Sequence, residues 1–111
     1  MTDKVLHLTR ARAAADEALL RMVTDGVMTA DAAHAMASAG FYSATRILSE
    51  LRVSGIGADC ITAAFEAELD RARTGKDQRL INSTEFTLAV WHGMQEDFAA
   101  WLETEKGAQT T

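Results

Sequence analysis

The residues best suited to metal binding or nucleophilic chemistry in this sequence are three histidines and one cysteine, His7, His34, His92 and Cys60. Zinc sites show short ligand spacings, such as two histidines four positions apart or paired cysteines. No such spacing occurs here, and each histidine falls on a different predicted helix. A single cysteine also excludes an intramolecular disulfide framework. We therefore expect no metal site, no cofactor and no catalytic thiol, with Cys60 half-buried.

Several carboxylates lie close together in the sequence and could suggest acid–base chemistry. General acid–base catalysis needs a carboxylate whose pKa is shifted by its surroundings within a pocket. Adjacent positions on a helix point about 100° apart, so neighbouring carboxylates do not converge on one point. We interpret them as solvated helix faces and expect a non-enzymatic protein without catalytic residues. The pairs are Asp16-Glu17 and Glu96-Asp97, and the alternating set is Glu66, Glu68 and Asp70.

The segment from Thr29 to Gly57 resembles a helix-turn-helix motif, with a short alanine-rich helix, a glycine-containing turn and a second helix. In that motif the second helix enters the DNA major groove. The segment holds two arginines against two acidic residues, whereas DNA-binding domains carry a clear basic excess. Nucleic-acid binding is therefore the alternative function. It would use Tyr42, Ser43, Thr45 and Arg46 toward the bases and Arg52 toward a phosphate.

An aromatic stripe marks the C-terminal third of the chain. Trp91, Met94, Phe98 and Trp101 follow the spacing of a heptad seam, which presses one helix against another. The surrounding segment is strongly acidic. Such a stripe predicts a packing or docking surface, and we assign these four residues tentatively to partner binding. The spacing leaves open whether the stripe belongs to the core of the chain or to an interface, including one between two copies.

The composition favours an all-α fold. Alanine dominates the apolar fraction and proline is absent, and these are the best and the worst helix formers. We predict a single bundle-like domain over residues 1–106 with about five helices, two long terminal ones bracketing three shorter ones, and a flexible polar tail over residues 107–111. The predicted helices run from Thr2 or Asp3 to Thr24, over 30–39, 41–53 and 58–74, and from an Asn82–Glu85 capping pattern to about Lys106.

The first and fifth predicted helices should pack against each other through their apolar seams. On the first helix, Leu20 and Val23 widen the stripe enough to serve a globular core. A glycine-containing turn over Ser38-Ala39-Gly40 should separate the second helix from the third.

Length and charge narrow the classes of function. The 111 residues suit one domain, and the net charge of −5 opposes bulk attraction to nucleic acid or to anionic lipid. No apolar run approaches the ~18 residues of a membrane span, and no secretory signal is recognisable, so we expect a soluble cytoplasmic protein. The function predicted is that of a small acidic regulator, an adaptor or inhibitor. It would bind another protein, possibly one with a basic surface, through a helical face.

Overall fold

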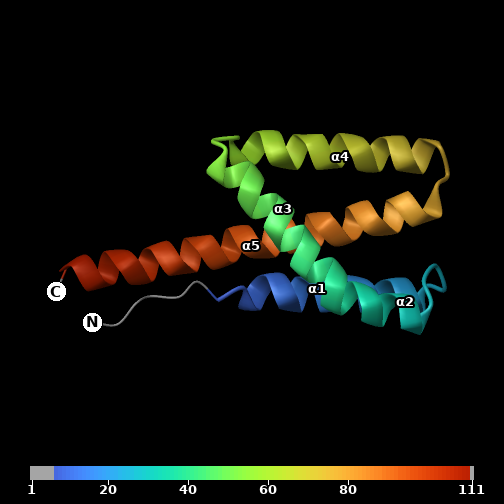
Figure 1. The fold of residues 1–111 in the computed structure, drawn as a ribbon, viewed down its shortest axis with the longest axis horizontal. Helices are drawn as coiled ribbons and strands as arrows, with labels where there is room; N and C mark the ends of the chain where they lie inside the picture. The colour runs from blue at the N-terminus through green and yellow to red at the C-terminus, as the bar shows by residue number, and fades with distance from the viewer. Residues whose placement is uncertain (1–6, 111) are drawn as a thin grey trace.

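The computed structural model describes residues 7–110, with side chains described for 7–103, and this part of the chain is helical without any strand. The predicted all-α fold is thereby confirmed (Figure 1). The elements are α1 (Thr9–Thr24), α2 (Ala30–Ala35), the π-helical segment η1 (Met36–Gly40), α3 (Phe41–Val53), α4 (Ala58–Thr74) and α5 (Gln78–Thr110).

The helix α5 is the central element of the fold. It spans 33 residues and runs antiparallel to α1 and α4, which lie on either side of it, while α3 crosses it (Figure 1). The predicted packing of the first helix on the last is confirmed, and this is the most extensive contact between two helices. The described part of the molecule is elongated, with extents of 52 × 28 × 18 Å.

The prediction of about five helices is close, but α2, η1 and α3 join into one continuous, bent helix, so residues 7–110 form four helices (Figure 1). Ala35, Met36, Gly40 and Phe41 all have right-handed helical dihedrals, so the predicted turn at Ser38-Ala39-Gly40 is wrong. A π-helical turn holds one extra residue and disturbs the regular carbonyl pairing.

Side chains bond the carbonyls around this π-helical turn. The Ser38 hydroxyl lies 3.2 Å from the carbonyl oxygens of both His34 and Ala35, to which it can donate, and the Arg12 guanidinium donates to the Ala37 carbonyl. These bonds come partly from α1, a different part of the chain. The helix therefore continues where the local sequence predicts a stop.

The helix ends also differ from the prediction. His7 and Leu8 are not helical, and the predicted start at Thr2 or Asp3 lies outside the described residues. With 16 residues, α1 is no longer than α4, which has 17, so of the two terminal helices only α5, with 33 residues, is long as described. At its other end α5 continues to Thr110, into the predicted tail, and Thr111 lies outside the described residues.

The start of α5 lies before the predicted capping pattern. Asp77 precedes the helix, and its carboxylate accepts a hydrogen bond from the Leu80 amide at 3.2 Å. The prediction that the Asn82–Glu85 pattern caps the start of this helix is therefore wrong. Asn82 lies inside α5 and its side chain is used elsewhere in the fold.

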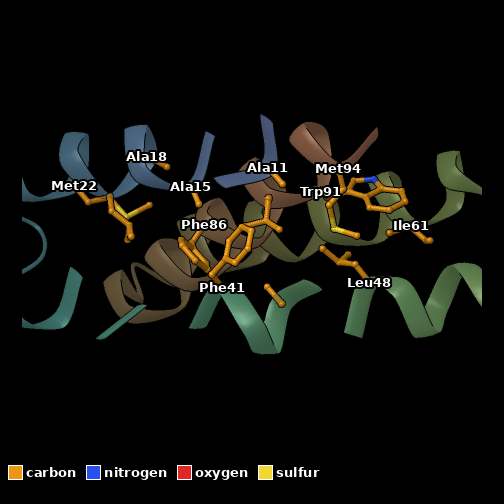
Figure 2. Close-up of a cluster of buried hydrophobic side chains, with 13 residues drawn as sticks. Ala11, Ala15, Ala18, Met22, Phe41, Leu48, Ile61, Phe86, Trp91 and Met94 are labelled. Carbon is orange, nitrogen blue, oxygen red and sulfur yellow. The ribbon is translucent and has the colours of Figure 1, made fainter. Parts of the chain in front are cut away.

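The core forms where α1, α3 and α4 meet α5 (Figure 2). Small side chains from α1 face large ones from the other helices, which lets the helices lie close together. The main members are Ala11, Ala15, Ala18 and Met22 from α1, Phe41 and Leu48 from α3, Ile61 from α4, and Phe86, Val90, Trp91 and Met94 from α5.

The backbones of α1 and α5 touch at Gly93. A Cβ atom placed on Gly93 would lie 2.5 Å from the Cα of Ala11 and 2.7 Å from both the amide nitrogen of Ala11 and the carbonyl oxygen of Arg10. These are main-chain atoms, so no side-chain rotation can make room. Glycine is required at this position by the closeness of the two helices.

Asp97 of α5 caps the N-terminus of α1. Leu8, which precedes α1, provides no side-chain cap. Instead, the Asp97 carboxylate accepts hydrogen bonds from the Arg10 amide at 3.0 Å and from the Ala11 amide at 2.9 Å. Amides of the first helical turn lack partners within the helix, and a carboxylate there also complements the helix dipole. Asp97 is only 4% exposed, so its assignment to a solvated face is wrong.

Replacing Gly93 by alanine should destabilise the fold, although alanine is the better helix former. We expect Gly93→Ala to lower the free energy of unfolding by about 1–3 kcal/mol, because the helices must separate to admit the methyl group. Gly40→Ala is the matched control. Its added Cβ would meet its nearest neighbour, a Met36 side-chain atom, at 3.4 Å, and we expect a gain of about 0.5–1 kcal/mol. Urea unfolding measures the change in unfolding free energy for both variants. If both variants were stabilised, or both destabilised, the backbone contact at Gly93 would be contradicted.

Removing the Asp97 carboxylate should leave two amides of α1 without acceptors. We expect Asp97→Ala to lower the free energy of unfolding by about 2–4 kcal/mol, with Asp97→Asn less affected because its amide oxygen can keep one bond. The neighbouring exposed Glu96 offers the control, and Glu96→Ala should stay within about 0.5 kcal/mol of wild type. Similar losses at both positions in a chemical denaturation series would refute the capping role.

Candidate functional site

The histidines and the cysteine lie scattered over the surface. His7 precedes α1, His34 lies on α2, His92 on α5 and Cys60 on α4, and all four are exposed. Among the described residues, no three histidine, cysteine or acidic side chains lie close enough together to hold a metal ion. The expected half-burial of Cys60 is wrong, because the adjacent Ile61 takes the core-facing position on α4. No described helix combines the length and the apolar character that crossing a membrane requires.

Two residues of the aromatic stripe of α5 are completely buried, and the other two are half-buried. Trp91 and Met94 are completely buried in the core (Figure 2). The Trp91 indole nitrogen also donates a hydrogen bond to the Thr62 hydroxyl of α4 at 2.8 Å. These two residues cannot contact a partner while the chain is folded, so their assignment to partner binding is corrected to the core. Phe98 and Trp101 are half-buried.

The residues of the predicted helix-turn-helix motif do not follow a turn, because 30–53 is one continuous, bent helix. Arg46 lies over the exposed Tyr42 ring, with 5.7 Å between the guanidinium carbon and the ring centre. Arg52 instead lies over the Phe98 ring of α5 at 4.6 Å. The predicted set therefore divides between the outer face of α3, with Tyr42, Ser43 and Arg46 exposed and Thr45 half-buried, and the contact that Arg52 makes with α5.

A shallow groove of about 320 Å³ lies between α1 and the α2–η1 segment; we call it the α1–α2 groove. Its more buried lining consists of Leu19 and Val23 from α1 with Ala33 and Ala37 from α2 and η1. Its exposed rim consists of Asp16, Leu20, Ala30 and His34. Because alanine side chains are small, the α2 side of the groove protrudes little.

Leu20 is the most unusual residue of this rim, because 68% of it is exposed. It follows the buried Leu19 and points about 100° further around α1, so the two leucines cannot both face the core. The prediction that Leu20 and Val23 widen the core stripe is therefore wrong for Leu20, while Val23 is half-buried. The exposure of Leu20 does not follow from the apolar stripe alone, and the signal for it is the angle between Leu20 and the buried positions Ala11, Ala15 and Ala18 around α1.

The accessible charge at the rim is acidic. Asp16 lines the groove on the α1 side, whereas Asp31 is exposed on α2 and does not line it. Arg12 lies nearby on α1, but its guanidinium is already occupied. It lies 3.9 Å from the centre of the Phe41 ring and donates to the Ala37 carbonyl. The groove therefore offers a partner an apolar surface with the Asp16 carboxylate at its edge.

Comparisons of the chain with protein-family models, with curated proteins and with solved structures find no significant match. The function of this protein is therefore inferred from the geometry of its own residues.

Proposed function

We propose that this protein is a small, acidic, non-enzymatic regulator, an adaptor or inhibitor, which binds a helix of another protein in the α1–α2 groove. The observation that carries the proposal is Leu20, a large aliphatic side chain that stands 68% exposed beside an apolar groove. A single exposed leucine is ordinary on a protein surface. An exposed leucine that continues an apolar groove instead forms one contiguous surface of the kind that partners bury.

The shape of the groove suits a helix. Two roughly side-by-side helices leave a channel into which the apolar face of a third helix can pack, as in helix-in-groove recognition. Alanines at positions 30, 33 and 37 permit a close approach on one side, and Leu20 supplies a large apolar contact on the other. Complete burial of a leucine side chain contributes about 1.5–3 kcal/mol, enough to make Leu20 a principal binding residue.

The charge distribution favours a partner helix with basic residues beside its apolar face. Asp16 lies at the edge of the groove, and the whole chain carries a net charge of −5. Complementary charges at the edge of an interface raise the association rate and exclude wrong partners more than they add affinity. Binding should accordingly become slower as the salt concentration rises.

A pair of matched substitutions tests the groove. We expect Leu20→Asp to reduce capture of the partner from nuclease-treated source lysate at least tenfold, because it places a charge on the apolar contact. Val53→Asp is the control, since Val53 is 85% exposed at the end of α3 and does not line the groove. Quantitative mass spectrometry of the captured proteins gives the ratio, and titration of the purified partner gives the affinity.

Both variants should fold like the wild type, because they alter exposed positions, and circular dichroism checks this. Equal capture by the two variants would contradict the groove. A partner that is captured from untreated lysate and lost from nuclease-treated lysate would point to nucleic acid instead. A dimer of the free chain that dissociates only in Leu20→Asp would identify the occupant as a second copy rather than another protein.

A further inference from the structure

A second groove, of about 340 Å³, lies on the other side of α2, between this helix and the first turns of α5. We call it the α2–α5 groove. Its apolar lining comes from Val27, Met28, Ala32 and Met36, of which Met28 and Met36 also pack against the core. Methionine side chains are flexible and polarisable, so they adapt to ligands of different shapes. This groove shares no lining residue with the α1–α2 groove.

The α5 side of this groove is polar, and hydrogen bonds connect it to the loop before α2. Arg79, Asn82 and Ser83 lie on one face of α5, because their spacing of three and four matches the helical repeat. Asn82 is buried, its side-chain nitrogen donates to the Val27 carbonyl at 2.9 Å, and its side-chain oxygen accepts from the side-chain amide of Gln78 at 2.8 Å. These bonds tie the loop before α2 to α5, so the two walls of the groove keep their separation.

Two hydrogen-bond donors on the α5 side of the groove have no acceptor among the described side chains. Among the residues whose side chains are described, none forms a hydrogen bond or an ion pair with the Arg79 guanidinium or the Ser83 hydroxyl. The nearby acidic groups are engaged: Asp77 accepts from the Leu80 amide, and Glu85 pairs with Arg73 at 3.0 Å. Arg79 and Ser83 are both exposed to solvent, so a cation and a hydroxyl one helical turn apart line the groove without a described partner from the chain.

We propose that the α2–α5 groove binds a small carboxylate that carries an apolar body. The planar guanidinium of Arg79 matches the two oxygens of a carboxylate, and the Ser83 hydroxyl can donate a further bond. The apolar body lies against Met28 and Met36. The groove volume falls within the range of small-molecule sites, which combine a mostly apolar lining with a few polar groups that fix orientation. This site is separate from the proposed protein-binding function and does not depend on it.

Arg79 is the one charged residue of the lining, and it selects the ligand by charge. A monoanion satisfies Arg79, whereas a dianion would need a second cation, and the lining holds none. An ammonium group would face Arg79 and be repelled, and an uncharged polar group would lose the charge-assisted bond. The chain should therefore distinguish a carboxylate from ligands that have the same apolar body and a different head group.

The test titrates the purified chain with octanoate, 1-octanol and octylamine below the concentrations at which they form micelles. We expect saturable octanoate binding, with amide shifts in a ¹H–¹⁵N spectrum confined to residues 27–36 and 78–84, and much weaker binding of the other two probes. Arg79→Gln should weaken octanoate binding about tenfold or more. Arg71→Gln is the control, because Arg71 pairs with Glu68 and does not line the groove.

A steric pair separates the groove from an isolated surface arginine. Ala32→Trp should abolish octanoate binding by filling the groove, whereas Ala35→Trp, at an exposed position of α2 that lines neither groove, should not. Octylamine binding as strong as octanoate binding would overturn the proposal. Unchanged affinity in Arg79→Gln would overturn it too, as would full binding by Ala32→Trp or shifts spread along the C-terminal half of α5.

Discussion

The close approach of α1 and α5 is the constraint on which the rest of this structure depends. The main chains meet at Ala11 and Gly93, and one turn later the Asp97 carboxylate holds the Arg10 and Ala11 amides. The contact sets how far α1 is shifted along α5, and the two hydrogen bonds set its rotation. With the small face of α1 turned to α5, Leu20 must point outward. The exposed side of the α1–α2 groove is therefore a consequence of how the core is packed.

Much of the fold follows from sequence patterns that act locally. Alanine content, absent proline and the seams of the first and last helices predict an all-α chain with these helices paired, as observed. The predictions are wrong where a residue distant in the sequence determines the local backbone structure. The helix from α2 to α3 continues through a π-helical turn whose Ala37 carbonyl accepts a bond from Arg12 of α1, and α1 is capped by a residue on another helix. Asn82 matches a capping pattern, but Asp77 begins the helix first.

The candidate site was harder to predict than the fold, because periodicity identifies an apolar residue without showing what covers it. Trp91 and Met94 lie where α3 and α4 meet α5, so they form core rather than surface. Leu20 has the same chemical character and no covering helix. Both grooves also depend on where α2 lies relative to α1 and to the start of α5, a placement set by tertiary contacts such as the bond from Asn82 to Val27. No pattern within a single helix contains that information.

The Asp97 cap has a consequence for the order in which the protein can mature. The hydrogen bond from the Ala11 amide joins residues separated by 86 positions. At ordinary rates of translation, about 5–20 residues per second, α1 is synthesised on the order of ten seconds before Asp97 exists. An isolated helix of 16 residues is marginally stable in water. Until α5 is synthesised, α1 therefore forms only a fluctuating helix. Folding of this chain is accordingly completed only after α5 has been made, and a nascent chain that stops before Asp97 keeps the beginning of α1 uncapped.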